Sequence, residues 1–203
     1  MDRKNHWNEI YSTKNLNQLS WYQPIPEISL KLIKASQLQK DAAIIDVGGG
    51  DSLLIDHLLE QGYTNLTVLD ISEKALERAQ QRIGQKAHLV HWINSDITLF
   101  DPPSTYDLWH DRAVFHFLTT QNDIEKYKEV LRVGVKHNSH LIVGTFSEKG
   151  PERCSGIKIK KYTKELLAKE FQPEFETLKL YSDNHQTPFN TLQPFSFAHL
   201  KKR

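Results

Sequence analysis

Two short segments of the chain carry residue types suited to holding a nucleoside. The first is the predicted strand 43–47, which ends in the glycine run 48–50. Glycines at that position leave backbone N–H groups bare and let a ligand approach the start of the next helix. The second is the strand 66–69, which ends at Asp70, where a carboxylate can accept hydrogen bonds from both hydroxyls of a ribose.

A third segment, residues 94–97, follows the next predicted strand and complements the first two. Asp96 can accept a hydrogen bond from an adenine amino group, and the backbone N–H of Ile97 can donate to the ring. Ile71 can pack on the face of the same base. Because ligands of parallel sheets bind beyond the carboxyl ends of the strands, the three segments together predict a pocket for an adenosine-type cofactor.

Each segment also has a simpler interpretation. A glycine run after a strand can be a tight turn, Asp70 can cap the following helix, and Asp96 can be a turn residue. The order and spacing of all three favour the pocket. A nicotinamide dinucleotide is the rival cofactor, but its Gly-x-Gly-x-x-Gly pattern requires glycine where Leu53 stands, and it does not explain Asp96.

The elements that must position these residues alternate along the chain. Short β-branched apolar runs are followed by segments of helical period, which is typical of a parallel sheet with helices on both faces. The pattern therefore predicts a doubly wound, Rossmann-like α/β fold. The expected strands are 43–47, 66–69, 88–93, 106–110 and 141–145, with helices at 26–36, 52–61, from Ser72 onward, 123–133 and 163–171, and a closing antiparallel pair at 175–181 and 195–200.

The pattern over residues 40–147 resembles class I S-adenosylmethionine-dependent methyltransferases. Further segments resemble a bacterial branch of that family: DRAVFHFLT at 111–119, GPERCSG at 150–156 and HQTPFNTLQPFSF at 185–197. The resemblance implies a seven-stranded mixed sheet whose last strand is antiparallel. It also implies a single domain over 1–203, with an N-terminal helical or lid segment at 1–40, a cofactor-binding core at 41–147, and a substrate loop with closing strands at 148–203.

The activity implied by the resemblance is transfer of a methyl group from S-adenosylmethionine to a nucleophilic atom of an acceptor. A small molecule is the leading acceptor class. A protein lysine is the alternative, and a protein that binds the cofactor without turnover is a third hypothesis. Either Asp51 or Ser52 can cap the helix that follows the glycine run, and Asp51 can instead approach the ammonium of the methionine part of the cofactor. The expected cofactor-binding residues are Asp46, Gly48, Gly49, Gly50, Asp70, Ile71, Asp96, Ile97 and His110.

The reacting end of the cofactor is expected beside the segment that follows the fourth strand. Asp111 and His116 are the predicted catalytic residues, as groups that bind the acceptor or remove a proton. His110 and Arg112 are further candidates for substrate binding, and His185 is another candidate base. The alternative is that Asp111 pairs with Arg112 to hold the loop, with His116 packed beneath it.

Two other segments can cover the pocket. Residues 148–161 form one expected lid, and the aromatic N-terminal segment either forms the other or packs a terminal helix onto the sheet. The prolines after Asp101 precede the fourth strand, so they are interpreted as a surface turn and not as the catalytic motif of enzymes that methylate DNA bases. The aromatic residues of the N-terminal segment are Trp7, Tyr11, Trp21 and Tyr22.

Composition limits the remaining possibilities. The 203 residues carry a formal net charge of +1, which does not point to a nucleic acid or an anionic membrane as a partner. Cys154 is the single cysteine, so an intrachain disulfide and a cysteine-based zinc site are excluded, and no metal site is predicted. The first residues lack the apolar core of a signal peptide, and no apolar run approaches a membrane span, so a cytoplasmic location is expected.

Overall fold

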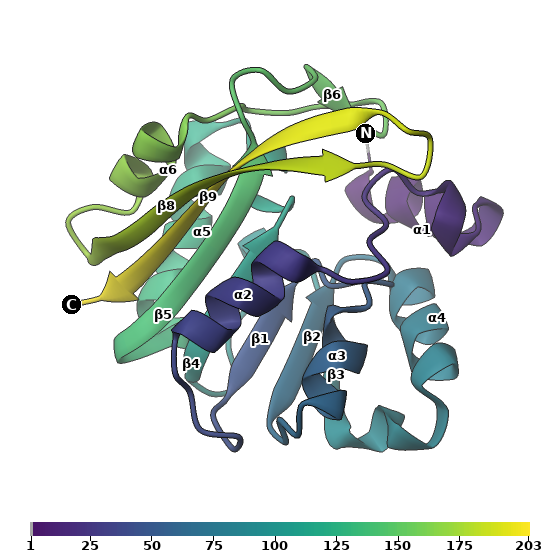
Figure 1. The fold of residues 1–203 in the computed structure, drawn as a ribbon, viewed down its shortest axis with the longest axis horizontal. Helices are drawn as coiled ribbons and strands as arrows, with labels where there is room; N and C mark the ends of the chain where they lie inside the picture. Colours follow the sequence, from purple (N-terminus) through teal and green to yellow (C-terminus); the bar gives the residue numbers. More distant parts are fainter. Residues whose placement is uncertain (1) are drawn as a thin grey trace.

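The computed structural model describes residues 2–203 and is organised around a mixed sheet of seven strands (Figure 1). The strands of this sheet are β1 (Ile44–Val47), β2 (Leu66–Asp70), β3 (Val90–Asn94), β4 (Tyr106–Arg112), β5 (Val135–Phe146), β8 (Phe175–Gln186) and β9 (Leu192–Lys202). Their spatial order is β3-β2-β1-β4-β5-β9-β8. Neighbours from β3 to β5 run parallel, whereas β9 pairs antiparallel with both β5 and β8. The predicted seven-stranded sheet with an antiparallel last strand is therefore confirmed.

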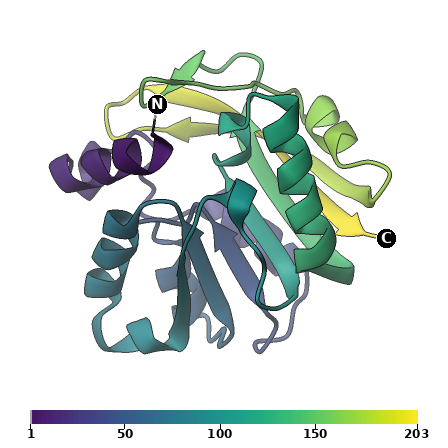
Figure 2. The ribbon, with the colours of Figure 1, turned by 180° about the vertical axis from the view of Figure 1, so that it is seen from behind.

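Helices cover both faces of this sheet. One apolar cluster joins the sheet to α2 (Glu27–Ala35), α3 (Leu54–Glu60) and α4 (Glu73–Ile83), and the other joins it to α5 (Gln121–Gly134) and α6 (Lys164–Glu170). Accordingly, α2 lies in front of the sheet in Figure 1, and α5 lies in front of it in the reverse view of Figure 2. This two-faced cover explains why every residue of β1 and β2 is buried.

Side-chain caps begin three of the helices, α4, α5 and α6. Ser72 Oγ accepts from the backbone N–H of Ala75 at 3.2 Å, which confirms the predicted cap of α4. Thr120 and Thr163 accept equivalent hydrogen bonds at the starts of α5 and α6. These caps fix where α4 and α5 start, and therefore how long the turns after β2 and β4 are.

The N-terminal aromatic segment folds mainly as the helix α1 (Arg3–Thr13), for which no boundaries could be predicted. It packs against α4, since Arg78 Nη1 donates to the carbonyl of Tyr11 at 2.7 Å and Ser72 Oγ donates to Asn8 Oδ1 at 2.8 Å. The predicted alternative, in which the segment packs onto the sheet, does not describe this placement. Within residues 2–203, every helix is too short or too polar to cross a membrane.

The region after β5 differs most from its prediction. Residues 153–158 form a small separate hairpin of β6 (Arg153–Cys154) and β7 (Ile157–Lys158), where only a loop was expected. The closing strands β8 and β9 are also longer than the predicted pair. Because β8 is an edge strand with mostly exposed side chains, its second half lacks the apolar alternation by which a strand is recognised.

Candidate active site

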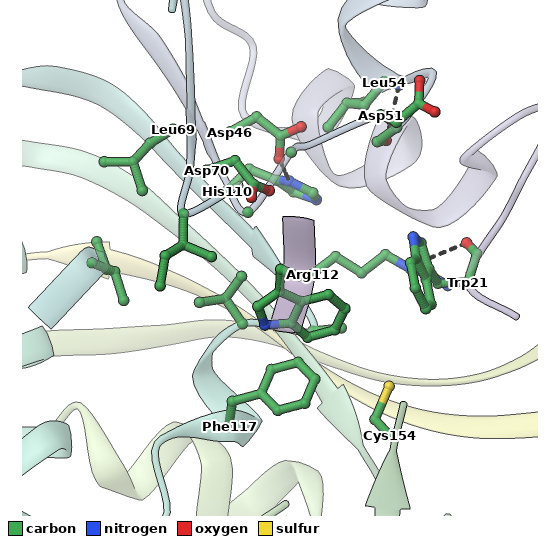
Figure 3. A pocket seen from close by; sticks show the side chains of 18 of the residues that line it. Trp21, Asp46, Asp51, Leu54, Leu69, Asp70, His110, Arg112, Phe117 and Cys154 are labelled. Atoms are coloured by element: carbon green, nitrogen blue, oxygen red, sulfur yellow. Dashed lines mark hydrogen bonds and ion pairs between the residues drawn. The ribbon is translucent and has the colours of Figure 1, made fainter. Parts of the chain in front are cut away.

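A pocket opens where the parallel strands end (Figure 3). It contains about 1310 Å³ of atom-free space, counting its open mouth. Its walls come from the carboxyl ends of β1, β2 and β4, from α1, and from β9. The residues expected to bind the cofactor line it with the exception of Gly50: they are Asp46, Gly48, Gly49, Asp70, Ile71, Asp96, Ile97 and His110.

The turn after β1 presents bare backbone to the pocket. Gly48 has a φ of 65°, in the left-handed region, and a Cβ at this position would overlap the side chain of Val114. A Cβ on Gly49 would lie 2.5 Å from Asp46 Oδ2. Gly50 packs behind the turn, where a Cβ would meet Asp70 Oδ2 and the Tyr11 hydroxyl, each at 2.9 Å. The first two glycines therefore keep a cradle open, and the third allows the turn to close on β2.

Asp46 and His110 form a buried polar pair beneath this turn. Asp46 Oδ1 lies 2.7 Å from His110 Nδ1, and His110 Nε2 lies 2.8 Å from Ser29 Oγ on α2. Both ring nitrogens are thus engaged, so His110 orients Asp46 and has no nitrogen left for a ligand. Asp46 Oδ2 is buried without a hydrogen-bond partner among the described residues. A buried carboxylate oxygen of this kind favours a ligand that brings a positive charge or an N–H donor.

Asp70 lies at the end of β2, buried beside the glycine turn. Its Oδ1 accepts from the backbone N–H of Ser72 at 2.7 Å. Burial, together with the neighbouring charge of Asp46, raises the pKa of Asp70 to about 7 against the opposing backbone hydrogen bonds. A ligand that donates hydrogen bonds to Asp70 would favour its charged form.

Asp96 and its neighbours form a third corner of the pocket. Asp96 Oδ1 accepts from the backbone N–H and the hydroxyl of Thr98, both at 2.8 Å. Within residues 2–203 its Oδ2 makes no hydrogen bond, and it lies 3.9 Å from Arg3 Nη1 on α1. Ile97 is buried and Ile71 is half-buried, and both line the same part of the cavity. An aromatic ring between the two isoleucines would therefore place an amino group near Asp96. We call Asp46, Asp70 and Asp96 the carboxylate rim.

Asp51 has neither of the roles expected for it. Its carboxylate is paired with Arg82 and, at 2.8 Å, with Arg78 Nη2 of α4. These two guanidinium groups neutralise it, so it offers little to a ligand ammonium. The helix α3 has no side-chain cap at Leu53, and the nearby hydrogen bond comes from Leu54 N to Ser52 Oγ at 3.2 Å.

Asp111 points away from the pocket and does not line it. Its carboxylate is fully buried and accepts from the backbone N–H groups of Val114 at 2.9 Å and Phe115 at 3.1 Å, and from the Tyr127 hydroxyl at 2.8 Å. Burial raises the pKa of Asp111 to about 6 against these donors. Asp111 makes no ion pair with Arg112, so the predicted pairing is wrong. The geometry favours a residue that holds the loop after β4, and it does not support the predicted catalytic role.

His116 is likewise packed into the protein. It is fully buried, and its Nδ1 accepts from the backbone N–H of Phe146 at 3.4 Å. Burial, together with the charge of Arg112, lowers the pKa of His116 to about 3, so the imidazole is a poor proton acceptor. His185 is also occupied, because its Nε2 lies 2.7 Å from the carbonyl of Ser20. Neither histidine lines the pocket, which agrees with the predicted alternative of a packed His116.

Arg112 does reach the pocket, where it contacts Trp21 of the expected lid and Phe195, which sequence reasoning did not assign to the site. Its guanidinium carbon lies 4.7 Å from the centre of the Phe195 ring, and Nη1 donates to the carbonyl of Trp21 at 3.3 Å. In Figure 3 it extends toward Trp21 between Asp46, Asp70 and His110 on one side and Phe117 and Cys154 on the other. We call the part of the pocket lining formed by Phe117, Phe146, Cys154, Gln193 and Phe195 the aromatic wall.

Both predicted lids contribute to the pocket. All four aromatic residues of the N-terminal segment line it: Trp7, Tyr11, Trp21 and Tyr22. Trp7 also packs edge-on against Phe117, with ring centres 5.2 Å apart. The two lids touch each other, since His6 Nε2 on α1 lies 3.0 Å from the carbonyl of Ser155 in the β6–β7 hairpin.

The chain was compared with protein families and with curated proteins. Residues 45–141 match a family model described as a methyltransferase domain. Among curated proteins, the chain is similar to EEF1A lysine methyltransferase 2 of Danio rerio, with 24% identity over 197 residues that cover 87% of this chain and 76% of that protein.

Two solved structures illustrate how widely the fold is shared. A SAM-dependent methyltransferase from Anabaena variabilis ATCC 29413 has 16% identity and a TM-score of 0.76, covering 98% of this chain and 93% of that one. The N-methyltransferase NodS from Bradyrhizobium japonicum WM9, in complex with S-adenosyl-L-homocysteine, has 16% identity and a TM-score of 0.72, covering 99% of each chain.

The match over residues 45–141 and the shared fold identify a methyltransferase domain in this part of the chain. The predicted enzyme class, with S-adenosylmethionine as its cofactor, is confirmed at this level.

Proposed function

We propose that the protein transfers a methyl group from S-adenosylmethionine to a small-molecule acceptor. The observation that carries this proposal is the carboxylate rim around one pocket whose floor is a bare glycine turn. S-Adenosylmethionine has a complementary set of donors: an ammonium group, two ribose hydroxyls and an adenine amino group.

Each aspartate of the rim accepts hydrogen bonds from a different donor group of the ligand. Asp46, oriented by His110 and Ser29, offers its unpartnered Oδ2 to the ammonium. Asp70 accepts from the ribose hydroxyls, and Asp96 accepts from the adenine amino group. Ile71 and Ile97 hold the faces of the adenine ring, and the glycine turn admits the backbone of the ligand without a clash.

The chain contributes alignment and exclusion of water at the reacting end. When bound, S-adenosylmethionine would supply a methyl group on a positively charged sulfur: a nucleophilic atom of the acceptor bonds to that carbon in line, the carbon–sulfur bond breaks, and S-adenosylhomocysteine is the leaving group. The aromatic wall and the two lids exclude water around that nucleophile. Asp111 and His116 do not line the pocket, so the proposal assigns them no proton transfer.

A protein lysine is the second candidate acceptor. It is supported by the similarity to EEF1A lysine methyltransferase 2, whose name states such an activity. The small molecule is preferred because the two lids, α1 and the β6–β7 hairpin, contact each other at His6 and Ser155, and lids joined in this way would restrict the entry of a side chain carried by a folded protein.

The remaining predictions from sequence complete the proposal. We place the chain in the bacterial branch on the segments at 111–119, 150–156 and 185–197, treat residues 1–203 as one domain, and expect it in the cytoplasm. A protein that binds the cofactor without turnover stays the non-enzymatic alternative.

Isothermal titration calorimetry tests the proposal directly. The protein is expected to bind S-adenosylmethionine and S-adenosylhomocysteine, and to bind NAD much more weakly. Transfer of a labelled methyl group to metabolite and protein fractions of a lysate then separates the two acceptor classes. NAD binding without a response to either sulfur compound would overturn the proposed function, and label in the protein fraction alone would favour the lysine alternative.

A further inference from the structure

An unpaired arginine stands inside the pocket. Arg112 Nη2 is buried and has no hydrogen-bond partner within residues 2–203, and no carboxylate among them forms an ion pair with this side chain. Asp183, Cys154 and Asp46, in that order, act to raise the pKa of Arg112 against burial, but neither aspartate forms an ion pair or a hydrogen bond with it within residues 2–203. A buried cation without a counter-ion is costly, and a ligand that brings an anion removes that cost.

The surroundings of Arg112 keep it charged and aimed at the cavity. Burial lowers the pKa of Arg112 to about 10, so the guanidinium remains protonated at neutral pH. Its plane is supported by the Phe195 ring on one side, and Nη1 is tied to the Trp21 carbonyl. The side chain is therefore held in one orientation with Nη2 left over for a ligand.

Gln193 supplies a second unused group on the same wall. It lies two residues before Phe195 on β9, so both side chains project from the same face of the strand. Gln193 Oε1 is buried and has no partner among the described residues. An acceptor oxygen here calls for an N–H or O–H on a ligand that fills the same pocket as the anion bound to Arg112.

We propose that the acceptor is a small organic carboxylate with an apolar or aromatic body, bound through an ion pair to Arg112 and a hydrogen bond to Gln193. This inference rests on the proposed function and names the substrate class. Phe117, Phe146 and Phe195 supply the apolar surface for the body of the acceptor. The same charge acts against the lysine alternative, because an ammonium brought beside an unpaired guanidinium is repelled.

The carboxylate of the donor's methionine is the other possible partner of Arg112. The acceptor is favoured because Arg112 contacts β9 and the aromatic wall, whereas the carboxylate rim lies on β1 to β3 and the turns after them. The two sources have the same chemistry, so the experiment must separate them.

The first arm of the test probes the wall with the donor side filled. The full chain is saturated with S-adenosylhomocysteine and titrated with benzoate, its neutral isostere benzamide and the cation benzylamine, with ligand-observed NMR as readout. Benzoate is expected to bind at least about tenfold more tightly than benzamide, which corresponds to about 1.4 kcal/mol, and benzylamine is expected not to bind. Equal affinities for benzoate and benzamide in the wild-type protein would overturn the inference without any variant.

The second arm assigns the preference to Arg112. Arg112→Gln is expected to abolish the advantage of benzoate, and Arg112→Lys, which retains a charge, is expected to keep part of it. Arg153→Gln is the matched control, because Arg153 is an exposed arginine next to Cys154 that donates to the Gly156 carbonyl. Gln193→Leu is expected to weaken the binding of carboxylates that carry a neighbouring hydrogen-bond donor, such as salicylate or anthranilate. Its affinity for benzoate, which has no such donor, is expected to stay unchanged. Loss of the benzoate preference in Arg153→Gln as well would also overturn the inference.

The third arm separates the acceptor from the donor. Arg112→Gln is expected to change the affinity for S-adenosylhomocysteine and for 5′-methylthioadenosine, which lacks the amino-acid group, by the same small factor of less than about threefold. A tenfold loss confined to S-adenosylhomocysteine would assign Arg112 to the donor carboxylate and overturn the inference. If the wild-type protein binds no S-adenosylhomocysteine at all, the proposed function itself fails, which is a distinct outcome.

Discussion

The carboxylate rim and the aromatic wall face each other across one pocket, and they are assembled in different ways. Asp46, Asp70 and Asp96 lie within or directly beyond β1, β2 and β3, which are neighbours in the sheet. The wall gathers Phe117, Phe146, Cys154, Gln193 and Phe195 from segments far apart in the chain. The rim is acidic, whereas the wall is mainly apolar, with Gln193 as its polar member and the positive charge of Arg112 beside it.

This difference shows how a widely shared fold can combine a common cofactor site with an acceptor site of its own. Parallel strands bring their carboxyl ends to one edge, so three local motifs converge on the rim because of the topology alone. The wall depends on how β9 and the hairpin after β5 fold back over that edge. Loops and closing strands of this kind vary freely on a fixed scaffold, so they are the natural place for acceptor selection.

The largest expected effect concerns Asp111, which holds the loop after β4 that leads to Phe117 of the aromatic wall. Asp111→Ala would leave two backbone N–H groups and the Tyr127 hydroxyl without an acceptor in a buried site. We expect a loss of about 3–5 kcal/mol in the free energy of unfolding, measured by urea denaturation. Asp111→Asn keeps one acceptor oxygen and should lose less. Full stability of the alanine variant together with lost turnover would restore the predicted catalytic role.

The second prediction tests whether the glycine turn belongs to the rim's binding function. Gly48→Ala combines left-handed backbone strain with a clash against Val114, and should weaken S-adenosylhomocysteine binding by more than about a hundredfold, or about 2.7 kcal/mol. Gly62→Ala is the matched control, since Gly62 has a φ of 84° and an added Cβ would meet no atom within 4 Å. The control shares the strain but should retain full affinity in calorimetry. Equal losses in both variants would mean that general strain, and not the cradle, explains the effect.

The third prediction concerns Asp70 and the ribose. Asp70→Ala removes charge-assisted hydrogen bonds worth about 2–3 kcal/mol, so affinity for S-adenosylhomocysteine should fall roughly tenfold to a hundredfold. Asp101→Ala is a matched control on the exposed turn before β4 and should leave affinity unchanged. A folded Asp70→Ala protein with wild-type affinity would show that the ribose lies elsewhere. The carboxylate rim would then not be the cofactor-binding surface.

The rim could be predicted from the sequence because its signals are local. Each strand is a short apolar run, and Asp70 and Asp96 follow two of them within a residue or two. Ser29, which completes the contact chain to Asp46 through His110, could not be found this way. A serine on a helix face carries no sign of the histidine that it meets 81 residues later.

The wall and the roles of Asp111 and His116 were harder to predict, for the same physical reason. A residue after a strand can point into the pocket or back into the protein, and the choice depends on tertiary neighbours. Asp111 points into the protein because it accepts hydrogen bonds from Tyr127 and from the N–H groups of the following loop, whereas Arg112 points into the pocket. The alternation of Gln193 and Phe195 on β9 was a usable signal for the wall, but nothing local indicates which strand lies beside β5.

The smallest expected effect is a pH dependence that distinguishes rim from wall. In the free protein the pKa of Asp70 is raised to about 7, chiefly by burial. Ribose hydroxyls donate to the charged carboxylate and should lower that pKa, so binding releases a proton below pH 7. Affinity for S-adenosylhomocysteine is therefore expected to fall as the pH decreases through 7, by up to about tenfold between pH 8 and pH 6. Calorimetry in buffers of different ionisation enthalpy would detect the released proton.

The stability of the ligand-free protein should follow the opposite trend. Because the folded pKa of Asp70 lies above its unfolded value, the stability that this group contributes is present at low pH and is lost as the pH rises through 7. The side chain in Asp70→Asn cannot titrate. Subtracting the pH profile of this variant from that of the wild-type protein therefore isolates the effect of Asp70 on affinity and on stability, and removes the contribution of Asp111. Arg112, with a pKa of about 10, stays charged over the same range, so the preference of the wall for benzoate should be flat from pH 6 to pH 8. A pH-independent affinity for S-adenosylhomocysteine, or a benzoate preference that follows the Asp70 titration, would show that rim and wall do not act as the separate donor and acceptor surfaces described here.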